Sequence, residues 1–293
     1  NTFKNPQENL KRSFVNWNPN ARLSYKFSQT KGLYFNYYGS TQQPSITQIQ
    51  PVLDNTNPLN VAIGNPYLKP SFSNRFNLQY NSYKVLSQQG LFFWGTYGFT
   101  ANPIVSNITT DQKTGASTYT YINTSTATSN FNVDIDLNKK IKKLDINAGI
   151  DISASGNKYL SYVNNAANTT NSNTYSFGVF AGKYKENVID ASFRGSVNYN
   201  TNHYSLQSQI NNNYWSYNLR PDFDFFLPKK FQIHTDGNYQ WNQATQSAPV
   251  YHQFIWNAWI GKKFFKKDNL LLKFSCNDIL NQNNGFSRYP NSN

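Results

Sequence analysis

Apolar and polar residues alternate with a period of two along most of the chain between residues 18 and 280. The stretch 131–137 is typical, with Phe, Val, Ile and Leu at every second position and Asn, Asp and Asp between them. Successive side chains of a β-strand point to opposite faces, so the pattern predicts strands with one apolar and one polar face. It recurs at 23–27, 72–80, 144–152, 189–199, 217–225 and 231–241. No comparable helical period appears, and we count about twelve strands.

The connections between these strands alternate between short and long. Short, mostly lysine-rich links are expected around 29–31, 84–89, 139–143, 183–187, 228–230 and 262–268. Longer links rich in Asn, Ser, Thr and Pro are expected at 41–70, 106–116, 154–173, 200–212 and 243–249. In an up-and-down meander, successive connections fall at opposite ends of the sheet. One end is therefore short and basic and the other long and polar, as in bacterial outer-membrane barrels.

Alternation alone does not say which face meets lipid, because a soluble β-sandwich also has apolar and polar faces. Three features favour a transmembrane, antiparallel, up-and-down β-barrel. The strands are long enough for a tilted bilayer crossing. Their number, about twelve, is too large for one β-sandwich, and their polar faces carry Asp and Arg. Aromatic residues near strand ends are then expected to form interfacial girdles. They are Tyr34, Tyr37, Tyr38, Phe92, Phe93, Trp94, Trp215, Tyr217, Trp256 and Trp259.

Composition narrows the class further. Of 293 residues, 38% are hydrophobic, 14% charged and 17% aromatic, so the chain is polar without being highly charged. The aromatic content argues against disorder, and no apolar stretch is long enough for a transmembrane helix. The net charge of +13 comes largely from lysines in the short turns, not from a basic stripe interleaved with aromatic residues. We therefore expect a lipid bilayer as partner and no nucleic acid.

Candidate chemistry is sparse. One cysteine and three histidines give neither a disulfide framework nor a zinc cluster, and no cofactor or nucleophile-elbow motif is present. Asp222, Asp224, His234 and Asp236 could be a hydrolase constellation, but lumenal walls of large barrels carry such residues in structural ladders with arginine, so we expect no enzyme. We expect Cys276 to continue a lipid-facing strand face. The lumen-facing candidates are Arg75, Asn77, Asp134, Asp136, Asp151, Arg194, Arg220, Asp222, Asp224, His234 and Asp236.

Three segments carry a family resemblance. They are GNPYLKPSFSNRFNLQY at 64–80, DQKTGASTYTYINTSTATSNFNVDIDL at 111–137, and KKFFKKDNLLLKFSCNDILNQ at 262–282. In their order and spacing they resemble TonB-dependent outer-membrane transporters, and most of all the large Bacteroidetes barrels related to them. The resemblance implies a 22-strand barrel, of which residues 1–293 would be one segment, roughly the C-terminal half. A plug domain and the closing strand are not found in this sequence.

The resemblance implies that the barrel lies in the bacterial outer membrane and takes up a solute too large for porins through a plugged lumen. Its expected partners are the TonB complex, reached through an N-terminal region absent here, and a surface lipoprotein. A barrel serving secretion or surface-complex assembly is the alternative, and a soluble β-sandwich binding protein is a lesser one. The sequence has no initiator Met or signal peptide, so we expect it to be a piece of a longer precursor.

Overall fold

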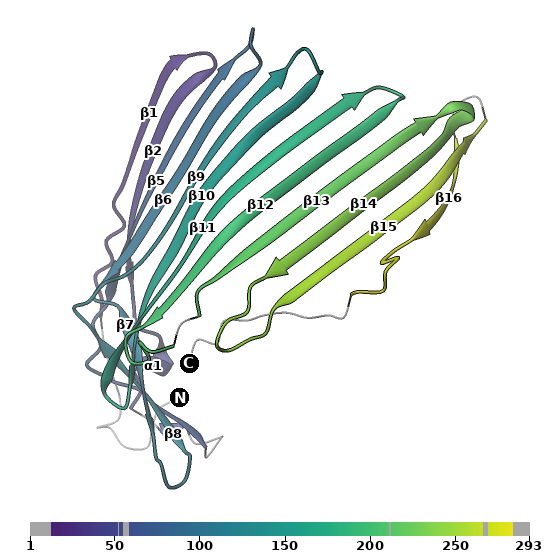
Figure 1. Ribbon diagram of the computed structural model, residues 1–293. Coiled ribbons are helices and arrows are strands. Elements are labelled where there is room, and N and C mark those ends of the chain that lie inside the picture. The colour runs from purple at the N-terminus through teal and green to yellow at the C-terminus, as the bar shows by residue number, and fades with distance from the viewer. Residues whose placement is uncertain (1–12, 52, 55–58, 211, 266–268, 284–293) are drawn as a thin grey trace.

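The computed structural model of the chain describes residues 13–51, 53–54, 59–210, 212–265 and 269–283. Its main body is one curved antiparallel sheet of twelve strands, which lie side by side in the order in which they follow one another along the chain (Figure 1). The strands, in spatial order, are β1 (Asn20–Ser28), β2 (Lys31–Gln42), β5 (Ser71–Lys84), β6 (Gln89–Ala101), β9 (Thr128–Ile141), β10 (Ile146–Val163), β11 (Ala166–Lys185), β12 (Ile189–Tyr204), β13 (Tyr214–Leu227), β14 (Phe231–Asn242), β15 (Tyr251–Phe264) and β16 (Leu270–Cys276). Twelve strands in a meander agree with the sequence prediction.

The pairing register keeps one face apolar and the other polar across the sheet. Residues directly opposite each other in an antiparallel pair share a face, and the register runs without a shift from β2 to β16. On β13 the apolar-face residues Trp215, Tyr217 and Leu219 are exposed, whereas Ser216 and Asn218 between them are half-buried. Side chains crowd on the concave side of a curved sheet, so this difference is the one expected when the polar face is the inner one.

The sheet is open. In the described part of the chain, β1 is hydrogen-bonded only to β2 and β16 only to β15, and these two edge strands do not pair with each other. They lie at opposite sides of the curved sheet in Figure 1. Each edge therefore presents a row of backbone groups that the described strands do not pair. None of the helices in the described ranges is long and apolar enough to cross a bilayer.

Short turns gather at one end of the sheet, as predicted. The links after β1, β5, β9, β11 and β13 are two to four residues long, and lysines lie both in these links and at the strand ends beside them. Lys140, near the end of β9, makes an ion pair with Asp145 in the link that follows, and this contact lowers the pKa of the Asp145 carboxyl. In another, Lys229 and Lys230 both adopt positive φ in the short helix η2 (Pro228–Lys230).

The opposite end carries a second, smaller group of elements. They are α1 (Ile46–Ile49), β3 (Leu53–Asp54), β4 (Asn60–Ile63), β7 (Ile104–Thr110) and β8 (Ser117–Asn123), seen below the main sheet in Figure 1. β8 pairs with both β4 and β7, and β7 in turn adds to the end of β10 in parallel. The links predicted at 41–70 and 106–116 therefore contain strands.

The NPYLKP phrase anchors this group to the main sheet. Leu68 has only 1% of its surface exposed. The Asn123 side chain accepts a hydrogen bond from the Lys69 amide and donates to the Lys69 carbonyl, while Asn65 donates to the Tyr121 carbonyl. The phrase thus ties the entry of β5 to the end of β8, two segments more than fifty residues apart.

The prediction of a long link at 154–173 is wrong. β10 continues to Val163 and β11 starts at Ala166, so the connection is two residues long. Asn164 and Asn165 have φ of 50° and 64°, the paired positive values of a type I′ hairpin turn, which asparagine tolerates. The polar composition suggested a loop, yet the residues form extended strands.

The aromatic residues expected as girdles divide between the two faces. Tyr37, Phe93, Trp215, Tyr217 and Trp256 lie on the apolar face, as a girdle requires. The polar face holds the others, which are Tyr34, Tyr38, Phe92, Trp94 and Trp259. Runs of adjacent aromatic residues must place members on both faces of a strand, so proximity to a strand end does not by itself identify a girdle.

We predict that the short turns face the periplasm and the β7–β8 end faces the cell exterior, because outer-membrane barrels have short periplasmic turns. Cysteine is placed at Lys113, at the exposed tip between β7 and β8, or at Lys142, in the exposed turn after β9. Both variants carry Cys276→Ser, since the native cysteine is exposed. A membrane-impermeant maleimide should label intact cells at position 113 only, and should label position 142 after the outer membrane is permeabilised. Labelling of position 142 alone in intact cells would invert this orientation.

Candidate functional site on the polar face

The register places all of the predicted lumen-facing residues on the polar face. They are Arg75, Asn77, Asp134, Asp136, Asp151, Arg194, Arg220, Asp222, Asp224, His234 and Asp236. They form three groups: a pair on β5, three aspartates on β9 and β10, and six residues on β12 to β14. That this face looks into a lumen stays a prediction.

The expected ladder of arginines and aspartates does not form. The ion pairs among the described residues include none of Arg75, Arg194 and Arg220. Arg194 instead lies over the ring of Phe180 on the neighbouring strand, 5.8 Å from the ring centroid. The register explains this, because Arg194 is directly opposite Phe180 on one side and Arg220 on the other, so no carboxylate stands across from it.

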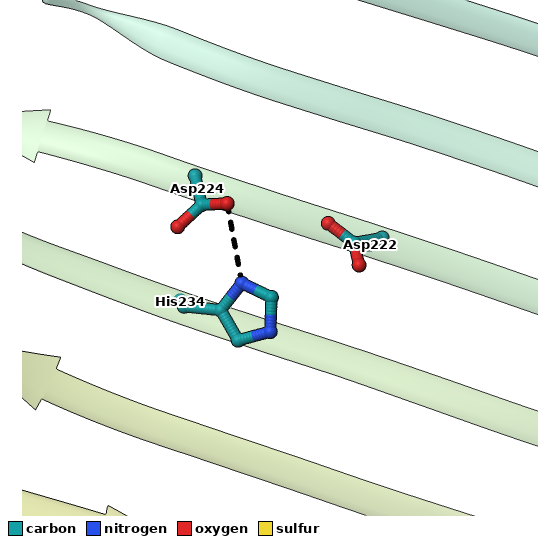
Figure 2. Close-up of side chains that lie close together, drawn as sticks. All are labelled: Asp222, Asp224 and His234. Carbon is teal, nitrogen blue, oxygen red and sulfur yellow. Dashed lines mark ion pairs between the residues drawn. The ribbon is translucent and has the colours of Figure 1, made fainter.

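A cluster of ionisable side chains joins β13 and β14. His234 Nδ1 lies 3.3 Å from a carboxylate oxygen of Asp224, which stands across from it on β13, and Nε2 lies 3.1 Å from Asp236 on its own strand. Figure 2 shows His234 and Asp224 joined by their ion pair, with Asp222 beside them. The imidazole is 18% exposed, so the cluster is only partly shielded from water.

A second layer of contacts fixes this cluster in place. Gln232 donates to the other oxygen of Asp224 at 3.1 Å, and Asn257 donates to Asp236 at 2.8 Å. The imidazole stacks on Trp259, with ring centroids 5.5 Å apart and planes 19° from parallel. The positions of Asp224, His234 and Asp236 are therefore fixed by contacts from β13, β14 and β15 together. Sequence reasoning missed Trp259, Gln232 and Asn257, and only the parity of Gln232 with His234 hinted at a shared face.

The chemistry available here is that of an Asp–His–Asp network. One donor atom each from Asp222, Asp224 and His234 lies within 4.8 Å of the others, which is compatible with metal-ligand spacing. However, both imidazole nitrogens already face carboxylates, that of Asp224 at Nδ1 and that of Asp236 at Nε2. Among the described residues no serine, threonine or cysteine hydroxyl or thiol is hydrogen-bonded to His234, as it would be in a nucleophile–histidine pair. The cluster is best described as a polar link between strands.

Sequence comparison identifies the family. Residues 1–203 and 161–293 both match the profile of an outer membrane protein beta-barrel family, and together they cover the whole chain. The chain belongs to this family. Comparison with curated proteins and with solved structures finds no match. Membership places this outer-membrane barrel chain in a lipid bilayer and removes the soluble β-sandwich from consideration.

Proposed function

We propose that this chain forms part of the wall of a TonB-dependent transporter, which takes up a solute too large for porins through a plugged lumen. The observation that carries the proposal is the open twelve-strand sheet with one continuous polar face. A sheet edge exposed to lipid leaves backbone groups unpaired, at several kcal/mol for each group, so membrane-spanning strands must close into a ring. Here the ring is completed by strands outside this sequence.

The width of that ring supports transport. An eight-strand barrel has an interior filled by its own side chains, whereas barrels of about 22 strands enclose a lumen that a plug can occupy. Twelve strands that are still open argue for the larger class. The NPYLKP and NDILN phrases, which resemble those of TonB-dependent transporters of Bacteroidetes, support 22 strands. In such a barrel the polar face with Arg75, Asp134 and the His234 cluster lines the lumen.

The proposal names two partners. The TonB complex would act through a region N-terminal to this sequence, and a surface lipoprotein would cap the loop end. Both follow from the resemblance, and the group of elements around β7 and β8 offers the surface on which a lipoprotein would sit.

In vivo cross-linking tests the proposal without knowledge of the solute. The full-length protein carries an affinity tag, is cross-linked in its own host cells, and is probed for TonB after purification. We expect TonB to be recovered with this protein and not with a porin of the same membrane, which serves as control. Recovery of secreted or surface-assembly components without TonB would contradict uptake and favour the secretion alternative.

A further inference from the structure

The polar face is hollowed near the loop end of β5, β6, β9 and β10. The hollow has a volume of about 390 Å³. At its floor Gly98 on β6 stands directly between Arg75 on β5 and Asn130 on β9, and because glycine has no side chain, the Asn130 amide reaches over this position. The neighbours of Gly98 on the same strand face are Thr96 and Thr100, which are also small.

A second hollow continues the first toward the cell exterior. It has a volume of about 460 Å³ and shares Thr100, Thr128 and Tyr159 with the first. Gln48 of α1 and the residues 104–106 of β7 line it from the side of the smaller group of elements. The two together fall in the size range of small-molecule sites and lie where the main sheet meets that group.

The side chains that the register directs into the first hollow are polar. They supply hydroxyl and amide groups, which both donate and accept hydrogen bonds, and no carboxylate lines either hollow. Asn130 and Asn157 stand directly opposite each other on β9 and β10, and Tyr159 is 59% exposed, so its ring offers an accessible flat surface.

Two cations line the first hollow, and the register directs only Arg75 onto the polar face, since Lys158 has the parity of the apolar face of β10. The Arg75 side chain is exposed, and no hydrogen bond or ion pair joins it to another residue of the described ranges. A guanidinium binds a carboxylate through two parallel hydrogen bonds. On the polar face of this hollow, an unpaired guanidinium surrounded by hydroxyl and amide groups thus provides recognition of one anionic group on an otherwise uncharged, hydroxyl-rich molecule.

We propose that the two hollows form a binding site for an acidic oligosaccharide, with Arg75 on a sugar carboxylate, Asn130 and Asn157 on hydroxyl groups, and Tyr159 against a sugar ring. The site rests on the proposed function, because it requires the polar face to look into the lumen. Acidic oligosaccharides are then the class of substrate that the transporter admits from the cell exterior.

Equilibrium binding to the purified full-length protein in detergent tests the site. Isothermal titration with digalacturonic acid measures the acidic ligand, and maltotriose measures a neutral one. Replacing Arg75→Gln should weaken digalacturonic acid binding about 10- to 100-fold, the loss expected for a charged hydrogen-bonded pair, and should leave maltotriose binding unchanged. Replacing Tyr159→Ala should weaken the binding of both sugars.

Lys84→Gln is the matched control, since it removes one positive charge from the turn end of the same strand, about 30 Å away at roughly 3.3 Å per residue. Heat-modifiable mobility on gels confirms that each variant is folded. Equal loss in both charge variants, absence of digalacturonic acid binding to the native protein, or competition by inorganic phosphate at equal concentration would overturn the proposal. Because binding needs no energy source, these outcomes are independent of TonB recovery, which reports on the proposed function.

Discussion

Replacing Ile152→Arg should lower the free energy of unfolding of the membrane-inserted barrel by about 2–4 kcal/mol, the cost of an arginine at the bilayer midplane on a lipid-facing position. Ile152 lies on the apolar face of β10 and is 43% exposed. Its exposed surface would then be buried in lipid, where a guanidinium has no partner. Urea unfolding of the full-length protein in phospholipid vesicles measures the effect.

The adjacent residue provides the control. Ser153→Arg places the same side chain on the polar face, directly opposite Asp134, which can accept its hydrogen bonds. We expect this variant to assemble with native stability or nearly so. If Ser153→Arg were as damaging as Ile152→Arg, or if Ile152→Arg were harmless, then the apolar face would not be the one that meets lipid.

Replacing Gly149→Ala, which adds a single methyl group, should lower the free energy of unfolding by nearly as much. A Cβ atom built there collides with the backbone oxygen of Leu137 on β9 and with the ring of Phe180, which lies across Gly149 on β11. Backbone atoms of a paired strand cannot move aside alone, so Gly149→Ala must displace the ring or separate the strands. We expect a loss of about 1–3 kcal/mol, as for other overpacked positions. The same urea unfolding experiment measures it.

Gly182→Ala is the matched substitution. Gly182 lies on the same face of β11, and the nearest atom to a Cβ there is the Ala191 oxygen at 3.6 Å, an ordinary contact. Alanine restricts the unfolded chain without strain at such a position, which is worth about 0.4–1 kcal/mol in favour of folding. Equal destabilisation by both substitutions would show that Phe180 does not pack over Gly149.

The sequence alone predicts which face of the sheet each residue lies on, but it does not predict which residues on neighbouring strands contact it. Facing follows from parity along one strand, so Asp134 and His234 could be assigned to the polar face without knowing which strands pair. Partners depend on the offset between strands, which alternation does not contain. The offset puts Arg194 opposite Phe180 and His234 opposite Trp259, neither of which the sequence indicated.

Connection lengths were misjudged for a related reason. Asn-, Ser- and Thr-rich segments read as loops because such residues are common in turns. In 154–173 they extend two strands beyond the region that lipid requires to be apolar, and Asn164 and Asn165 suffice for the turn. The composition of a strand reflects the medium around it. Where the strands of a barrel extend beyond the bilayer, that medium is water, and both strand faces are polar.

The long β10–β11 hairpin gives the barrel rim an uneven height. A tilted strand crosses the hydrocarbon in about 9–11 residues, whereas β11 has 20. With the short turns at the periplasmic surface, the remaining ten or so residues extend about 33 Å along the strand at about 3.3 Å per residue, which at a tilt of about 45° is roughly 20–25 Å above the lipid. β14, with 12 residues, barely clears it. In the predicted orientation, a large molecule arriving along the cell surface would be blocked sterically on the β10–β11 side and would approach over the lower β14 side, opposite the tall hairpin.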